Sequence, residues 1–361
     1  MIKIKIAIID GDLVGKNTHR FPNLACMKLS AYHKDNQDDV ILKLDYENLD
    51  EFDKVYISKA FTESKTPDHV LEMDNVKYGG TGFFYEKAEP LPIEIEHLYP
   101  DYHLYDEWVN KQLANGEKRK NYSYYLDYSI GFTTRGCFRK CEFCVNKRYD
   151  RAFLNSPIEE FINSSRKNIC LLDDNVLAYP GWKDIMFKLD QTGKRIQFKQ
   201  GLDIRLLTEE KAEIISKLKY KDDFIFAFDH IKDREMMEEK LTIWNKYRTK
   251  ATKLYVLVAY ESQDEQDIIN AFERVKILMK YKCKPYIMRY NEYENSKYRG
   301  VYINLARWCN QSSLIKTMSF REFAQRVGKG SAAYRYTEDF EKEHPEIAEQ
   351  YYDMKWEHFN P

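Results

Sequence analysis

The chain has 361 residues, 43% of them hydrophobic and 32% charged, with a formal net charge of -1. This composition excludes a largely disordered chain, because the apolar fraction is sufficient for a sizeable core. The near-neutral charge gives no general attraction to nucleic acid or to an anionic membrane, although a local basic patch would escape this average. No apolar run approaches the about 18 residues of a membrane span, and the start of the chain lacks the apolar stretch of a secretion signal. We therefore expect a cytoplasmic protein without a membrane partner.

Residues 1–90 are predicted to form a small Rossmann-like domain. The stretch from Ile2 to Ile9 alternates apolar and charged positions before a polar turn, which is typical of a strand. Pro22-Asn23 precedes apolar residues at helical spacing, which predicts a helix from Leu24. Strands that alternate with helices indicate a parallel α/β sheet. Further strands are expected at Val40–Leu42 and Val55–Ile57, and Val76–Gly82 is predicted to be a short strand that runs into a glycine turn.

Residues 91–128 are predicted to connect this domain to the next, because prolines, charges and tyrosines occur there without a clear period. Lys118–Lys120, followed by Tyr122, Tyr124 and Tyr125, combines basic and aromatic residues as sites for single-stranded nucleic acid do. Acidic residues surround this stretch, which favours a solvated linker and argues against a nucleic-acid partner.

The alternation of strands and helices resumes at Ser129 and predicts a barrel. Helices are expected at Glu209–Leu218 and Gln266–Met279. Six strand–helix units within residues 129–310 predict a partial (β/α)6 barrel, since a complete eight-stranded barrel takes about 250 residues. Residues 311–361 are predicted to form a helical C-terminal segment, which completes an α/β fold. The six expected strands are Ser129–Thr133, Ile169–Leu172, Ile196–Lys199, Phe224–Phe228, Leu254–Ala259 and Pro285–Arg289.

Three of the seven cysteines, Cys137, Cys141 and Cys144, stand close together directly after the first expected barrel strand. A disulfide framework explains this distribution poorly in a chain with no export signal, whereas a metal site explains it well. Soft thiolates favour iron–sulfur clusters or zinc over hard cations. A structural zinc site needs four nitrogen or sulfur ligands, and no fourth ligand stands nearby in the sequence. The spacing therefore favours a cubane with three cysteine ligands and one open iron.

The C-x3-C-x2-C arrangement, with the aromatic Phe143 before the third cysteine, resembles the signature of the radical S-adenosylmethionine (SAM) superfamily. This resemblance implies a [4Fe-4S] cluster on Cys137, Cys141 and Cys144, with SAM bound at the open iron. One electron, from a donor such as flavodoxin or ferredoxin, would cleave SAM to a 5′-deoxyadenosyl radical that abstracts hydrogen from a substrate. The substrate class stays open among small molecules, peptides and nucleotides, and no catalytic residue is assigned.

Polar residues follow three of the expected barrel strands, where ligands gather in parallel α/β folds. They are Asp173 and Asp174 after the second strand, Gln200, Asp203 and Arg205 after the third, and Asp229-His230 after the fourth. The first two strings resemble those of cobalamin-type radical SAM proteins, which implies cofactor contacts for their residues. The alternative for the aspartates is that they cap helices or turns. Cys170 and Cys309 are expected to be buried structural cysteines.

The N-terminal domain, with Phe21–Ser30 and Gly79–Gly82, resembles the cobalamin-binding-type domain that precedes many radical SAM barrels. The usual lower-ligand signature, Asp-x-His-x-x-Gly, is absent, and His19 in particular has no glycine three residues later. This absence argues against a cobalamin cofactor without closing the case, since base-off cobalamin binds without that histidine. Two alternatives to a hydrogen-abstracting enzyme stay open: a cobalamin-dependent radical SAM methyltransferase and a noncatalytic metal-binding module.

Overall fold

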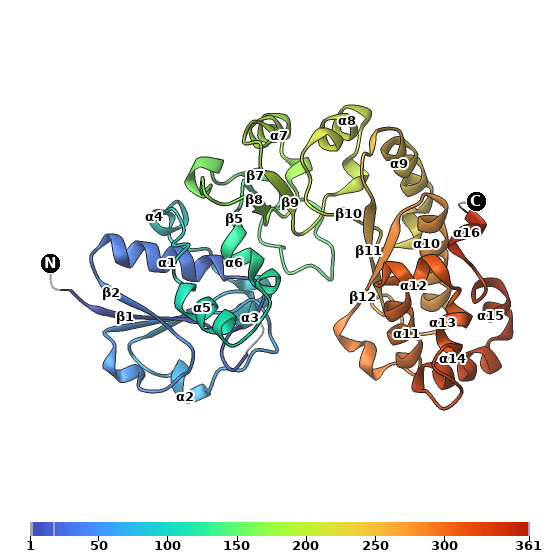
Figure 1. Ribbon diagram of the computed structural model, residues 1–361, viewed down its shortest axis with the longest axis horizontal. Helices are drawn as coiled ribbons and strands as arrows, with labels where there is room; N and C mark the ends of the chain where they lie inside the picture. The colour runs from blue at the N-terminus through green and yellow to red at the C-terminus, as the bar shows by residue number, and fades with distance from the viewer. Residues whose placement is uncertain (1–2, 17–18, 360–361) are drawn as a thin grey trace. The chain divides into compact units, whose positions relative to one another are not determined.

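A computed structural model describes residues 3–16 and 19–359 of the chain (Figure 1). The chain divides into two compact units, Met1–Gln197 and Phe198–Pro361. Ile2, at the start of the first expected strand, lies outside the described residues. The division between the units falls inside a strand and does not test the domain boundaries expected from the sequence, which stay a prediction.

The N-terminal sheet has four parallel strands in the order β2-β1-β3-β4, which confirms the strands expected there. Its central strand is buried on both faces, because Ile6 and Ile8 enter one hydrophobic core while Ala7 and Ile9 enter another. Asn23 caps the first helix by accepting hydrogen bonds from two amides of its first turn. The elements are β1 (Lys5–Asp10), α1 (Leu24–Asp35), β2 (Asp39–Lys43), β3 (Lys54–Ser58), α2 (Asp68–Leu71), β4 (Val76–Gly79) and α3 (Thr81–Phe84).

Residues 91–128 form helices that pack on this sheet, and the prediction of a solvated linker is wrong. Trp108, Tyr122 and Tyr125 are buried and share one core with Ile6 and Ile8. Apolar area buried against the sheet outweighs the charges that suggested a solvated segment. Tyr122 and Tyr125 of the basic stretch are therefore part of the hydrophobic core. The helices are α4 (Ile93–Glu96), α5 (Asp106–Ala114), the 3-10 helix η3 (Arg119–Tyr122) and α6 (Ser123–Asp127).

A second sheet of the first unit has the strand order β5-β8-β9, with β5 and β8 parallel. Both of these strands are buried along their whole length, as expected for the core of an α/β fold. A short antiparallel pair, β6 and β7, follows β5 and was not foreseen. The elements are β5 (Tyr128–Gly131), β6 (Thr134–Arg135), β7 (Phe153–Leu154), β8 (Asn168–Leu171), the 3-10 helix η5 (Val176–Ala178), α7 (Trp182–Gln191) and β9 (Arg195–Phe198).

The second unit contains the parallel sheet β10-β11-β12 and a largely helical C-terminal part. All six strands expected after Ser129 are therefore present, and the mixed α/β class is confirmed. Their closure into one partial barrel stays a prediction. The elements are η6 (Ile204–Leu206), α8 (Glu209–Lys217), β10 (Phe224–Ala227), α9 (Arg234–Tyr247), β11 (Thr252–Val258), α10 (Glu265–Lys280), β12 (Lys284–Arg289), α11 (Arg299–Cys309), α12 (Ser312–Thr317), α13 (Phe320–Gln325), α14 (Ala332–Glu343), α15 (Pro345–Tyr351) and α16 (Trp356–Phe359).

Over residues 3–16 and 19–359, no helix is long and apolar enough to span a membrane.

Candidate functional site

The three clustered cysteines lie on one loop, residues 136–152, which we call the cysteine loop. Strands β6 and β7 pair directly before and after it, so its two ends are held side by side. Gly136 opens the loop with φ of 85°, and a Cβ there would stand 2.3 Å from the carbonyl oxygen of Arg151. Only glycine fits this close backbone approach. The loop thus starts from a fixed, tightly packed position.

The sulfur atoms of the loop accept hydrogen bonds from nearby nitrogens. The amide of Arg139 donates to Cys137 Sγ and that of Asn146 to Cys144 Sγ, each over 3.4 Å. Asn175 Nδ2, from the segment after β8, also donates to Cys137 Sγ over 3.4 Å. Donors directed at sulfur stabilise the negative charge of a thiolate and tune the reduction potential of an iron–sulfur cluster. These contacts suit metal-bound thiolates.

The three thiols are half-buried and near one another. Burial raises the pKa of the Cys144 thiol, and the neighbouring thiols of Cys141 and Cys137 add to this effect. A bound metal reverses such a shift, because it deprotonates a coordinating thiol. Among residues 3–16 and 19–359, no three Cys, His, Asp or Glu side chains converge as ligands of a single ion do. Three thiols alone do not complete the four-ligand set of a structural zinc site, whereas a cubane takes each cysteine on a different iron.

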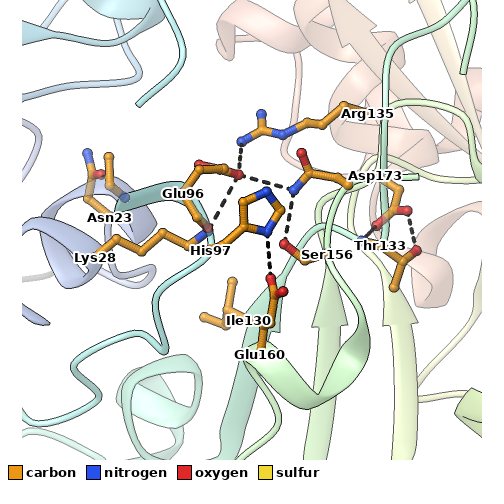
Figure 2. Close-up of polar contacts among 12 residues, drawn as sticks. Asn23, Lys28, Glu96, His97, Ile130, Thr133, Arg135, Ser156, Glu160 and Asp173 are labelled. Carbon is orange, nitrogen blue, oxygen red and sulfur yellow. Dashed lines mark hydrogen bonds and ion pairs between the residues drawn. The ribbon is translucent and has the colours of Figure 1, made fainter. Parts of the chain in front are cut away.

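Asp173, which follows β8, anchors the turn between β5 and β6. Its carboxylate accepts from the amide of Thr133 over 3.1 Å and from the Thr133 hydroxyl (Figure 2). It also accepts from the amide of Thr134 over 2.6 Å and from the Thr134 hydroxyl. The side chain is buried, and burial raises its pKa while these hydrogen bonds act against the shift. Both oxygens are engaged by the protein itself, so the geometry gives Asp173 a structural role. Its expected contact with a cofactor stays a prediction.

Asp174 holds the cysteine loop at two points. One carboxylate oxygen accepts from the amide of Gly136 over 2.7 Å, and the other from Asn146 Nδ2 over 2.6 Å. Gly136 directly precedes Cys137, and Asn146 stands two residues after Cys144. Burial raises the pKa of Asp174, and the hydrogen bond from Gly136 opposes this shift. Neither Asp173 nor Asp174 caps η5, which begins after Asn175 without a side-chain cap.

A buried ion network fixes the base of the cysteine loop (Figure 2). Glu96 Oε1, on α4, lies 3.1 Å from Arg135 on β6 and 3.4 Å from Lys28 Nζ on α1. Asn155 Nδ2, directly after β7, donates to the same oxygen over 3.1 Å. Burial opposes the charge on Glu96, but Arg135 and Lys28 hold its pKa below the ordinary value. The arginine of the network precedes Gly136, so the N-terminal domain and the loop share one set of contacts.

Sequence reasoning missed this network and the role of Asn146. Glu96 is 39 residues from Arg135 and 68 from Lys28 along the chain. Such pairs have no periodic or motif signature, because only the packed fold brings the partners together. On its outer side the loop also forms ion pairs between Lys147 and Glu86, at 2.6 Å, and between Arg148 and Glu89.

The remaining candidates have simpler settings. Phe143 lies half-buried between two of the cysteines. In the second unit, Asp203 accepts from the amide of Arg205 over 3.2 Å and from its Nε over 2.7 Å, which confirms the capping alternative for Asp203. Gln200 stands in the turn before η6. Contacts of Phe143, Gln200 and Arg205 with a cofactor stay predictions.

Three further groups outside the cysteine loop also have defined settings. In the second unit, burial raises the pKa of Asp229, against the opposing charge of Arg274. Cys170 and Cys309 are buried, as expected for structural cysteines.

Two aspartates at the carboxyl edge of the N-terminal sheet accept hydrogen bonds from other residues of the first unit. Asp10 Oδ2, at the end of β1, accepts from the hydroxyl of Tyr105 over 2.9 Å. Asp12 accepts from the amide of Ala60 and the hydroxyl of Ser64, each over 2.6 Å. Burial raises the pKa of Asp10 to about 7. Ligands of such sheets bind where the strand order reverses, which in this sheet is between β1 and β3.

No protein-family model matches the chain, and no curated protein matches it either. Among solved structures the chain is similar to TsrM from Kitasatospora setae, a radical S-adenosylmethionine methyltransferase determined with cobalamin and a [4Fe-4S] cluster bound. The two share 11% sequence identity and superpose with a TM-score of 0.55, over 80% of this chain and 72% of TsrM. At this identity the likeness shows the fold alone: the α/β fold described above also occurs in a radical SAM enzyme.

Proposed function

We propose that the protein is a radical SAM enzyme whose Cys137, Cys141 and Cys144 hold a [4Fe-4S] cluster. The observation that carries the proposal is the cysteine loop itself, which carries three half-buried thiols, two of which, Cys137 and Cys144, accept hydrogen bonds from nitrogen. A cluster held by these cysteines would supply one electron for the cleavage of SAM to methionine and a 5′-deoxyadenosyl radical, and this radical would abstract hydrogen from the substrate.

The residues of this chain bind and orient the cluster. The thiols of Cys137, Cys141 and Cys144 supply three ligands, and the short loop contains no fourth cysteine, which leaves one iron for SAM. The amides of Arg139 and Asn146 direct their hydrogens at sulfur, which stabilises the thiolate charge. Partial burial of the loop restricts the access of water to the sulfur atoms.

The cofactor and substrate contacts of the proposal rest on the resemblance of the motif. SAM would lie at the open iron, with Phe143, Gln200 and Arg205 as candidate contacts. An electron donor such as flavodoxin or ferredoxin would reduce the cluster. The substrate is a small molecule, peptide or nucleotide, and the similarity of fold to TsrM supports the enzyme class without naming the substrate.

Anaerobic reconstitution tests the proposal. Purified protein is loaded with iron and sulfide, reduced, and mixed with SAM, and 5′-deoxyadenosine is measured by chromatography. We expect 5′-deoxyadenosine from the native chain and none from Cys141→Ala. An intact cubane that yields no 5′-deoxyadenosine would support the noncatalytic metal-binding module instead.

A cobalamin-dependent methyltransferase is the second candidate, because TsrM was determined with cobalamin bound. The absence of the Asp-x-His-x-x-Gly signature argues against it. Equilibrium dialysis against hydroxocobalamin separates the two candidates. Retention of about one equivalent per chain supports the methyltransferase, and loss of all colour removes it.

A further inference from the structure

The side chain of Asp174 bridges the two ends of the metal-ligating stretch. Gly136 and Asn146 enclose all three cysteines, and each donates to a different oxygen of this one carboxylate. Asp174 lies three residues after the end of β8, a buried strand paired with β5, so the sheet positions the segment that carries it. The loop is thereby tied at both ends to the sheet by hydrogen bonds to a charged acceptor, which are among the stronger ones in proteins.

We infer that Asp174 is the positioning residue of the cysteine loop, acting as a clamp that sets the separation of Cys137 and Cys144 before metal arrives. This inference rests on the proposed function for what the loop holds. Asp174 acts through Gly136 and Asn146 and needs no contact with cluster or SAM. Asp173 plays a separate part, because its partners are Thr133 and Thr134, ahead of the loop.

The donor and acceptor pattern of the clamp allows a reciprocal exchange. Asn146→Asp places two carboxylates against each other where a donor met an acceptor, which destabilises the contact. Adding Asp174→Asn restores complementarity, because the amide introduced at position 174 would donate to the new carboxylate while its oxygen still accepts from Gly136. The double variant keeps one carboxylate and one amide at the site. A residue that only fills space would not show such mutual rescue.

The first readout is retention of iron by the reconstituted protein during exposure to a chelator. Asp174→Ala and Asn146→Asp should each lose iron at least about tenfold faster than the native chain, since each breaks a hydrogen bond to a charged group. Asn146→Asp with Asp174→Asn should retain iron within about threefold of the native rate. Equal rates for all four proteins, or no rescue in the double variant, would overturn the clamp.

The second readout is amide hydrogen exchange over residues 136–146 in the metal-free protein, which does not depend on any cluster. Faster exchange in Asp174→Ala and Asn146→Asp, with native exchange in the double variant, supports the clamp. Identical exchange in all four proteins contradicts it. Failure of the native chain to form a cubane overturns the proposed function instead, so the two failures are distinguishable.

Discussion

The first unit contains two sheets whose carboxyl edges both present acidic residues, yet the two edges differ in what those residues serve. At the N-terminal sheet, Asp10 and Asp12 accept hydrogen bonds from Tyr105, Ser64 and backbone amides. We call this edge the closed edge, because its two carboxylates are engaged by neighbouring residues. At the β5-β8 edge, Asp173 and Asp174 accept from the segments around the cysteine loop and leave its thiols half-exposed. Carboxylates at strand ends therefore do not by themselves mark a ligand site. Their role depends on which segment of the chain they hold in place.

The largest effect should separate the two edges by their cysteines. Cys144→Ala removes one of three cluster ligands and should abolish the cubane and all 5′-deoxyadenosine formation. Cys26→Ala is the matched control, because Cys26 is buried beside β1, away from the cysteine loop in the sequence, and its thiol donates to the carbonyl of Ile9. Iron and sulfide analysis of both reconstituted variants checks this. Equal iron content in the two would break the comparison.

The next effect concerns the network that joins the N-terminal helices to the base of the cysteine loop. Glu96→Gln removes the carboxylate that opposes the buried Lys28 ammonium and should lower the free energy of unfolding by about 3 kcal/mol. Urea denaturation of the full chain measures this loss. Lys28→Met combined with Glu96→Gln removes both buried charges and should recover most of the stability. If Glu96→Gln were as stable as the native chain, the ion network would not contribute to the stability of the fold.

The closed edge should show a pH dependence that the cysteine edge does not share. The pKa of Asp10 is raised to about 7 in the folded protein, above the unfolded value of about 3.9. The folded chain thus keeps this proton over a range where the unfolded chain has lost it. The contribution of Asp10 to stability is complete below pH about 4 and declines by at most about 1.4 kcal/mol per unit up to pH about 7.

Asp10→Asn should remove this dependence, because the amide carries no ionisable proton. Denaturation midpoints of the native chain and of Asp10→Asn, compared from pH 5 to pH 8, are expected to diverge as the pH rises, with the native chain losing more stability. Parallel curves would mean that Asp10 ionises normally in the folded protein.

The smallest effect tests whether the closed edge has only a structural role. Asn23 accepts from the amides of Ala25 and Cys26 at the start of α1 and donates to Ser58 Oγ over 3.1 Å. Asn23→Ala should cost about 1 kcal/mol of stability, the usual value of a helix cap. Iron content and 5′-deoxyadenosine formation per folded chain should stay unchanged. A loss of iron with this variant would connect the two edges more closely than the contacts described here.

The sequence was sufficient to predict the features that are local. The period of β1 to β4, the start of α1 after Pro22-Asn23 and the spacing of Cys137 to Cys144 are set by neighbouring residues, and the structure has the strands and the start of this helix where they were expected. The burial of Tyr122 and Tyr125 could not be predicted, because the charges around them suggested solvent.

The contacts that hold the cysteine loop could not be predicted from the sequence for a different reason, which is the separation of the partners along the chain. Asp174 is 38 residues from Gly136, and Glu96 is 39 residues from Arg135. An aspartate after a strand has the same appearance in sequence whether it caps a turn, as Asp203 does, or ties down a loop, as Asp174 does. Only the fold distinguishes these roles, since it decides which donors come within reach.

The most direct test of the central claim is electron paramagnetic resonance of the reduced, reconstituted protein with and without SAM. Three cysteine ligands leave one iron open, so we expect the signal of a reduced [4Fe-4S] cluster that changes when SAM is added. The same signal should be absent from Cys137→Ala. A cubane signal that SAM leaves unchanged, or a protein that binds zinc in preference to iron, would contradict the proposed radical SAM function.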